Sequence, residues 1–232
     1  MSRKSKRGSQ KPQIKKSIAL IGDGETESWY IQKLKEQEKD ILDSMNLTLN
    51  SEPKLPSKKK GLKKLCEDIK NLEKEHDKIF WIVDFDTIIR ETKEKKNGKE
   101  RKLDTFRKYF NDLSGKEKIT IIINNPCLEF WFLQHFGKIS KYYSGYYGEL
   151  EKELKKHIQN YDKKRKFYNS CNGGKGIYSL LKQKLGKAIS NSRDISNSKK
   201  LPKLDFNKTD INSYEIGTTE MYKLFDELKI NN

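Results

Sequence analysis

The chain has 232 residues, three cysteines and a net charge of +17 at neutral pH. This length can bury a substantial core, so we expect one domain with at most one appendage. The cysteines are far apart and show no C-x-x-C spacing, which argues against a zinc site or a disulfide framework. No apolar run reaches the ~18–20 residues of a membrane span, and no signal-peptide pattern is present. A soluble protein of the reducing cytoplasm is therefore expected.

The positive charge fits a polyanionic partner such as nucleic acid. Only seven of the 50 basic residues are Arg, however. An excess of Lys, Asn and Ile is what an AT-rich genome would produce without selection for nucleic-acid binding. Charge alone therefore supports this partner weakly, and the argument depends on particular side chains.

The first part of the chain alternates strand and helix patterns after a polar beginning. Residues 1–13 contain no large apolar residue beyond Met1, so a disordered basic arm is expected. The elements predicted next, in chain order, are a strand over 17–22, a helix over 26–39, a strand over 47–50, a helix over 59–75, a strand over 79–84, a charged loop over 90–102, a helix over 103–113, a strand over 119–123 and a helix over 127–136 that Asn125-Pro126 starts.

Continuous apolar strands separated by helices indicate a parallel sheet covered on both faces. We therefore predict an α/β core of four parallel strands over residues 14–137. Residues 138–232 are rich in Lys and Tyr and are expected to form a helical extension packed on this core. Its predicted parts are helical segments over 148–168 and 176–190, a polar stretch over 190–210 and a last helix over 218–229.

Two clusters of acids follow two of these strands. Alternate residues of a strand point to the same side, so the two acids of the second cluster should aim both carboxylates at one spot. Ligands bind at the carboxyl ends of the strands in open α/β sheets. Acids gathered there in a basic chain suggest a hard divalent cation that faces a phosphate. The clusters are Asp23-Gly24-Glu25-Thr26-Glu27 and Asp84-Phe85-Asp86.

Each cluster also has a less specific interpretation. Thr26 could cap the following helix, with Glu27 in its first turn. Asp84 and Asp86 could simply cap a turn. With Thr87, they also match the D-x-D-x-T nucleophile motif of haloacid-dehalogenase-type phosphatases, although nothing downstream offers the paired acids that those enzymes need.

Further polar residues could join the same edge. Asn125 and Glu129 follow the strongest predicted strand. His135 ends the helix after it and could be either a partner of the helix dipole or a catalytic group. Lys163 and Lys164 offer cations that could meet a scissile phosphate.

Four segments in this order resemble the RloB-like proteins, small Toprim-fold proteins associated with bacterial phage resistance and distantly similar to the OLD-family nucleases. The resemblance extends over about residues 18–228. The segments are an E-G-x-T-E type motif at 23–27 with Tyr30 after it, the apolar strand and D-x-D motif at 79–86, N-P-C-x-E-x-W-x-x-x-H-F from Asn125 to Phe136, and a weaker Tyr-x-Lys motif at 161–163 followed by a C-terminal helix after Thr218-Thr219.

The resemblance implies a Toprim-like sheet whose acids hold Mg²⁺ or Mn²⁺, and an AAA-type ATPase as a partner. The first acid of the family motif is usually Glu, and here it is Asp23, which is one methylene shorter. Glu25 could compensate for this difference.

The sequence therefore suggests a Mg²⁺-dependent phosphodiesterase, specifically a nuclease effector of antiphage defence. One alternative is a non-catalytic Toprim module that binds nucleic acid or the ATPase. The other is the phosphatase. In the preferred hypothesis the metal ligands are Asp23, Glu27, Asp84 and Asp86, the cations that stabilise the phosphoryl charge are Lys163 and Lys164, and the residues that support the pocket are Glu25, Asn125, Glu129 and His135.

Overall fold

The computed structural model describes residues 15–22, 24–51, 61–94, 100–143 and 148–230. The predicted basic arm and the candidate ligand Asp23 lie outside these residues. Within them, no helix combines the length and the apolar character that crossing a membrane requires.

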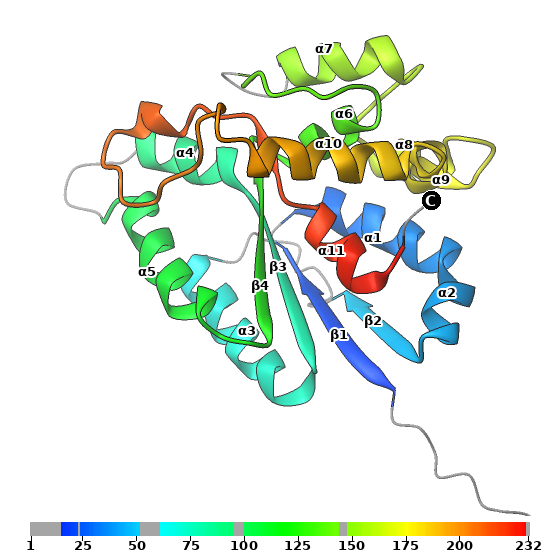
Figure 1. Cartoon of the computed structure of the whole chain (residues 1–232), viewed down its shortest axis with the longest axis horizontal. Coiled ribbons are helices and arrows are strands. Elements are labelled where there is room, and N and C mark those ends of the chain that lie inside the picture. Colours follow the sequence, from blue (N-terminus) through cyan, green and yellow to red (C-terminus); the bar gives the residue numbers. More distant parts are fainter. Residues whose placement is uncertain (1–14, 23, 52–60, 95–99, 144–147, 231–232) are drawn as a thin grey trace, which may run out of the picture.

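The described residues form an α/β fold around one mixed sheet in the order β2-β1-β3-β4-β5 (Figure 1). The first four strands are mutually parallel, as predicted, and β5 pairs antiparallel with the end of β4. The predicted α/β class is confirmed, with a two-residue edge strand added. The strands are β1 (Lys16–Ile21), β2 (Leu47–Ser51), β3 (Lys78–Asp84), β4 (Ile119–Asn125) and β5 (Thr218–Thr219).

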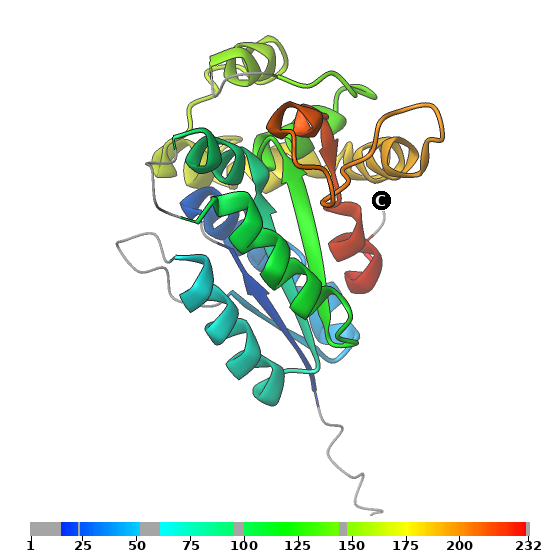
Figure 2. The same cartoon turned by 90° about the vertical axis from the view of Figure 1, so that its left-hand side faces the viewer.

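Helices cover both faces of the sheet. In Figure 2 the cyan and green helices α3 and α5 lie in front of the strands, the blue helices lie behind them, and the red C-terminal helix α11 lies to their right. The helices are α1 (Glu25–Gln37), α2 (Lys39–Ser44), α3 (Leu62–Glu75), α4 (Phe85–Lys93), α5 (Lys102–Ser114), α6 (Leu128–Gln134), α7 (Gly148–His157), α8 (Arg165–Ser170), α9 (Gly176–Lys182), α10 (Leu185–Asn197) and α11 (Tyr222–Leu228), with a 3-10 turn η1 (Ile211–Tyr214).

Strand alternation divides the core into two layers. Ile18 and Leu20 of β1 pack with α1, α6 and the C-terminal helices, whereas Ala19 and Ile21 pack with α3, α4 and α5. Both sets are buried, so a slip of one residue would exchange the two faces and is strongly disfavoured. This fixed register brings the carboxyl ends of β1, β3 and β4 to one edge.

Two boundaries near this edge differ from the prediction. α4 begins at Phe85 and occupies the start of the predicted loop over 90–102, because its residues Phe85, Ile88 and Ile89 form a buried apolar face. α6 begins at Leu128, so Pro126 lies before the helix and not at its first position. The Pro126 carbonyl instead accepts a hydrogen bond from the Asp86 N–H at 2.9 Å.

The C-terminal extension is also more broken than predicted. The helical segment over 148–168 is two helices, α7 and α8, and the connection between them contains Asn160 at a positive φ of 55°. The predicted polar stretch begins inside α10, where Ile189, Ser192 and Ile195 form a buried stripe. Thr218 and Thr219 form β5, so the last helix starts only at Tyr222.

Candidate functional site

The polar residues of interest gather where three parallel strands end. β3 ends at Asp84, β4 ends at Asn125, and α1 starts shortly after β1 with Glu27 in its first turn. Glu129 lies in the first turn of α6, directly after β4. Parallel strands place all of these positions at one edge of the sheet, which is where an α/β fold binds ligands.

Asp84 is at the centre of the group. Its Oδ1 accepts a hydrogen bond of 2.9 Å from the Leu128 N–H at the start of α6. Burial, together with the like charges of Glu27, Glu129 and Asp86, raises the pKa of Asp84 well above its usual value, and the positive charge of Lys163 opposes this shift. The carboxylate is therefore poorly compensated, and a cation bound beside it would relieve this repulsion.

Asp84, Cys127 and Glu129 could together hold a metal ion. Each offers one ligand atom, and these three atoms lie within 4.8 Å of one another. Burial and the neighbouring carboxylates raise the pKa of the Cys127 thiol, so its sulfur stays protonated and is a weak ligand for a hard cation. Cys127 was absent from the predicted site, and its place in the N-P-C segment directly after a strand was the available signal.

Glu129 and Lys163 form a buried ion pair. The Glu129 side chain is only 4% exposed, and its Oε1 lies 2.8 Å from the Lys163 Nζ. Burial opposes ionisation of Glu129, but Lys163, the Cys127 thiol and the local backbone N–H outweigh it and lower its pKa. Burial likewise opposes the charge on Lys163, and the surrounding acids outweigh it and raise its pKa. Both groups are therefore charged.

Two tyrosines from the C-terminal extension complete the surroundings of Glu129. The Tyr168 hydroxyl donates to Glu129 Oε1 at 3.1 Å and lies 2.9 Å from the Tyr161 hydroxyl. Both rings are buried. The extension thus supplies the ammonium group and the hydroxyl groups that stabilise an acid of the core.

Glu27 is held in place by the turn before α1. Its side chain is buried, and Thr26 Oγ1 donates to its Oε2 at 3.1 Å. A Cβ at Gly24 would overlap this carboxylate, with Glu27 Cδ only 2.7 Å away. Gly24 occupies the N-cap position, so the alternative in which Thr26 caps the helix is wrong. Glycine at this position thus leaves room for the carboxylate.

Asp86 lies in a different element from the one predicted. The strand ends at Asp84, so Asp86 lies in the first turn of α4 and strand alternation does not aim it. Its charge nevertheless raises the pKa of Asp84. Burial, opposed by Lys163 and reinforced by Glu129, raises the pKa of Asp86 itself. The charges of Asp84 and Asp86 therefore interact, although the described residues whose ligand atoms lie within 4.8 Å of one another are Asp84, Cys127 and Glu129, without Asp86.

Other predicted site residues make contacts elsewhere. Lys164 is exposed and pairs with Asp162 at 2.8 Å. Glu25 is exposed in the first turn of α1. Asn125 is fully buried, and its Nδ2 donates to the Tyr214 carbonyl at 2.8 Å, which ties β4 to η1.

His135 is buried after the last turn of α6. Its Nδ1 lies 3.1 Å from the Trp131 carbonyl oxygen, a contact that requires a proton on this nitrogen. Burial lowers the pKa of His135 to about 3, so the ring is neutral at physiological pH. The ring also packs edge-on against Trp131 with 4.9 Å between the ring centroids.

The fold and this edge define a class: an α/β protein with a mostly parallel sheet and a buried carboxylate cluster at the ends of its strands. Residues 18–228 match the family model of the RloB-like proteins. The chain therefore belongs to the RloB-like family, which confirms the resemblance found in its motifs. No curated protein and no solved structure matches the chain.

Proposed function

We propose that this protein is a Mg²⁺-dependent phosphodiesterase that acts as a nuclease in antiphage defence. The observation that carries the proposal is the position of Asp84 at the end of β3, where its ligand atom lies within 4.8 Å of those of Cys127 and Glu129. Burial and the charges of Glu27, Glu129 and Asp86 raise its pKa there. Such a group is best stabilised by a divalent cation, and a cation there would attract a phosphate.

The donor set fits a hard metal ion. Asp84, Asp86 and Glu27 offer carboxylate oxygens, which suit Mg²⁺ or Mn²⁺, and Asp23 is proposed as a fourth ligand. Once bound, the metal would polarise the scissile phosphate and lower the pKa of an attacking water. Gly24 keeps the Glu27 carboxylate in position.

Lys163 is proposed to stabilise the charge that builds on the phosphoryl oxygens. Its side chain is 21% exposed, and the 2.8 Å ion pair with Glu129 fixes the position of its ammonium group. In this role Glu129 is a positioning residue for Lys163 and not a primary metal ligand. A charged donor fixed in a partly buried site contributes more than a solvated one.

Nucleic acid and an AAA-type ATPase remain the proposed partners. The net charge of +17 supports the first, because it favours association with a polyanion. The ATPase is proposed from family membership alone.

The test is cleavage of supercoiled DNA, single-stranded DNA and tRNA with Mg²⁺, with Mn²⁺ and with EDTA. We expect metal-dependent cleavage that falls about 10²-fold or more in Lys163→Met, since a fixed cation at the phosphate is lost. Lys166→Met is the matched control, because Lys166 is exposed on α8 and is not among the proposed site residues. Its activity should stay within about twofold of the parent.

A double variant separates this function from its rivals. If Asp84→Asn with Asp86→Asn cuts as well as the parent, the proposed metal site is wrong. Nucleic-acid binding without cleavage in every condition would favour the non-catalytic module. A phospho-aspartate trapped at Asp84 would favour the phosphatase.

A further inference from the structure

The outer edge of β4 is only partly covered. β3 pairs with β4 along its length, but on the other side β5 pairs only with Asn124 and Asn125. At the next position, Ile123, Glu220 takes the place of a paired strand. Glu220 Oε2 accepts a hydrogen bond from the Ile123 N–H, and the Glu220 N–H donates one to the Ile123 carbonyl, both at 3.1 Å.

The rest of this edge is open. Alternate residues of a strand send their N–H and C=O groups to the same side, so Ile121 presents both groups on the side that Ile123 uses. The Ile119 N–H donates to the Lys116 carbonyl at 3.0 Å. In the part of the chain that the structure describes, no strand pairs with Ile121 on this side.

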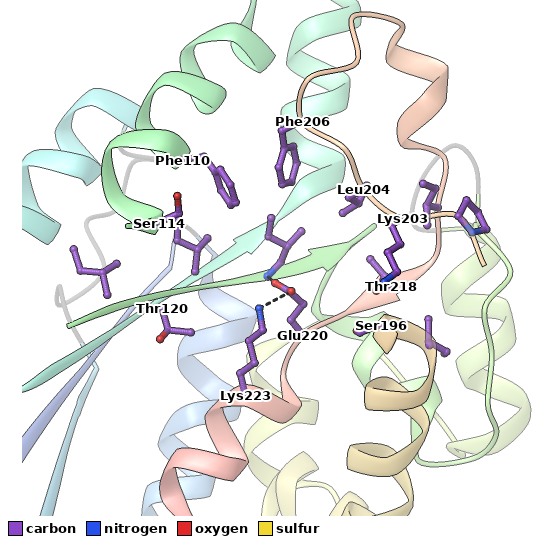
Figure 3. Close-up of a pocket in the computed structure, with 16 residues that line it drawn as sticks. Phe110, Ser114, Thr120, Ser196, Lys203, Leu204, Phe206, Thr218, Glu220 and Lys223 are labelled. Carbon is purple, nitrogen blue, oxygen red and sulfur yellow. Dashed lines mark hydrogen bonds and ion pairs between the residues drawn. The ribbon is translucent and has the colours of Figure 1, made fainter. Parts of the chain in front are cut away.

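A cavity of about 580 Å³ lies over this open edge (Figure 3). The edge of β4, α5, the end of α10, the segment 202–206 and the start of α11 surround it. One side carries Phe110, Leu204 and Phe206. The cavity has the volume of a ligand site, and its lining combines apolar side chains with Ser, Thr, Lys and Glu residues.

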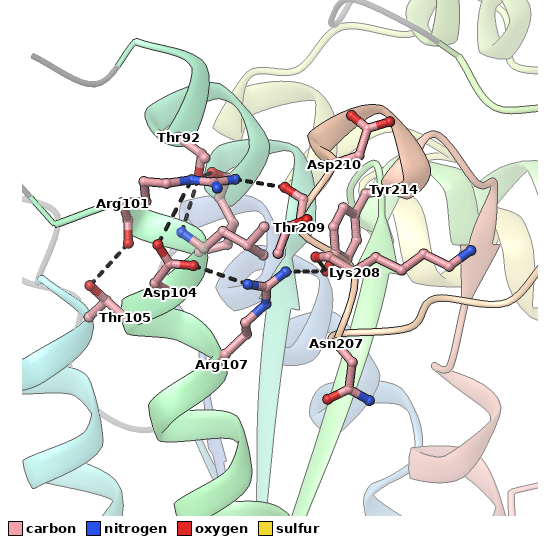
Figure 4. Close-up of polar contacts among 12 residues, drawn as sticks. Thr92, Arg101, Asp104, Thr105, Arg107, Asn207, Lys208, Thr209, Asp210 and Tyr214 are labelled. Carbon is pink, nitrogen blue, oxygen red and sulfur yellow. Dashed lines mark hydrogen bonds and ion pairs between the residues drawn. The ribbon is translucent and has the colours of Figure 1, made fainter.

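The outer wall of the cavity is fixed. Phe206 contacts Phe110 with 4.6 Å between the ring centroids. The segment after it is attached to α5 by two arginines (Figure 4): Arg101 donates to the Thr209 carbonyl at 3.1 Å, and Arg107 donates to the Tyr214 hydroxyl at 2.9 Å. The wall is thus preorganised, which lowers the cost of binding.

The rim of the cavity carries two lysines, Lys203 and Lys223, and one acid, Glu220. Lys223 is neutralised by Glu220, with 2.6 Å between the charged atoms. Lys203 is exposed and has no ion pair with any residue that the structure describes. An acidic side chain at this rim would complement Lys203.

We propose that this cavity binds an extended peptide of another protein in which apolar and acidic residues alternate. The peptide pairs with the open edge of β4 as an added strand. Ile119 to Ile123 spans roughly 13 Å at ~3.3 Å per residue, enough for about four residues of such a peptide. Backbone hydrogen bonds to Ile121 provide affinity, and alternate side chains reach the aromatic wall and Lys203. A peptide accounts for the open backbone groups, which a compact apolar ligand would leave unpaired.

The probe is a fluorescein-labelled hexapeptide in which Val alternates with Glu, measured by fluorescence anisotropy on the full chain. Two counterparts carry an N-methyl group at one or the other central residue, and only one of these nitrogens can face β4. We expect one methylated peptide, but not the other, to bind about fivefold to tenfold more weakly. Equal binding of both methylated peptides and the parent, or no binding of any peptide, would overturn the proposal.

Charge reversal tests the specificity. Lys203→Glu should weaken binding of the Val/Glu peptide and strengthen binding of a peptide in which Val alternates with Lys. Lys200→Glu, an exposed neighbour outside the lining of the cavity, should change neither. The amide signal of Ile121 should shift in NMR spectra when the peptide binds. If Lys203→Glu bound the two peptides with the same preference as the parent, the proposal would be contradicted. A parent protein that sediments as a dimer and a Lys203→Glu variant that sediments as a monomer would also contradict it, because the cavity would then bind a second copy of the chain.

Discussion

Asp84 carries an electrostatic cost that its substitution should reveal. Because its pKa is raised in the folded protein, the carboxyl keeps its proton to a higher pH than in the unfolded chain. Ionisation of Asp84 therefore lowers the free energy of unfolding once the pH rises above the pKa of the unfolded chain, about 4. This destabilisation is complete above the pKa of the folded protein.

Asp84→Asn should consequently stabilise the metal-free protein while it abolishes metal binding. We expect the free energy of unfolding at pH 7 to rise by roughly 1–2 kcal/mol in EDTA, since no buried charge has to form. The Asn Oδ1 can still accept the Leu128 N–H. Urea unfolding near pH 4 is the control, where the gain should shrink. An equal gain at both pH values would contradict this account.

Gly24 offers a second test at a single residue. A methyl group at this position would displace the Glu27 carboxylate, whose Cδ would lie 2.7 Å from the new Cβ. Gly24→Ala should therefore weaken Mn²⁺ binding, measured by calorimetry, by about tenfold or more, in the range seen when groups that orient metal ligands are lost. Gly22→Ala is matched, because its Cβ would meet its nearest neighbour at an ordinary 3.6 Å. If the two substitutions weakened Mn²⁺ binding equally, the space beside the Glu27 carboxylate would not determine the metal affinity.

At the scale of elements, a second buried acid joins α9 to the end of α1. Glu38 is 1% exposed and accepts from the Tyr178 hydroxyl at 2.6 Å and from Lys182 at 2.8 Å. Glu38→Ala would leave the buried Tyr178 hydroxyl without its acceptor, whereas Lys182, whose side chain is 32% exposed, can be hydrated. We therefore expect a cost of about 1–3 kcal/mol of stability, as for a buried polar group left unsatisfied.

The control for this prediction lies on the same helix. Glu36 forms an ion pair with Lys33 at 2.7 Å, but its side chain is 47% exposed. Glu36→Ala should change the free energy of urea unfolding by about 0.5 kcal/mol or less. If the two variants unfold alike, Glu38 does not hold the C-terminal helices to the core.

At the scale of the whole molecule, the net charge of +17 predicts strongly salt-dependent binding to nucleic acid. Each neutralised phosphate adds about −0.9 to the slope of log K against log salt on duplex DNA, so about five contacts give a slope near −4.5. Anisotropy of a labelled duplex between 50 and 200 mM KCl, in EDTA, measures this slope. A slope close to zero would exclude the basic surface as a phosphate-binding surface.

Most of the sheet could be predicted from the sequence because burial on both faces leaves continuous apolar runs such as Ile119–Ile123. The site was harder to predict. The apolar run before Asp84 correctly predicts that Asp84 ends a strand. Strand alternation predicts that Asp86 points to the same side, but Asp86 lies in the first turn of α4. The change from strand to helix between them depends on how Phe85 packs against Phe106, with 5.4 Å between the ring centroids.

The α/β class, the family and the edge at which the acids lie follow from the amino-acid sequence, because strand periodicity and motif order are local properties of the chain. Which cation compensates which acid, and where the sheet stays open among the described residues, depends on the tertiary structure. Lys163 lies 2.8 Å from the buried Glu129, whereas its exposed neighbour Lys164 pairs with Asp162. Such pairings join residues far apart in the chain, and no local pattern records them.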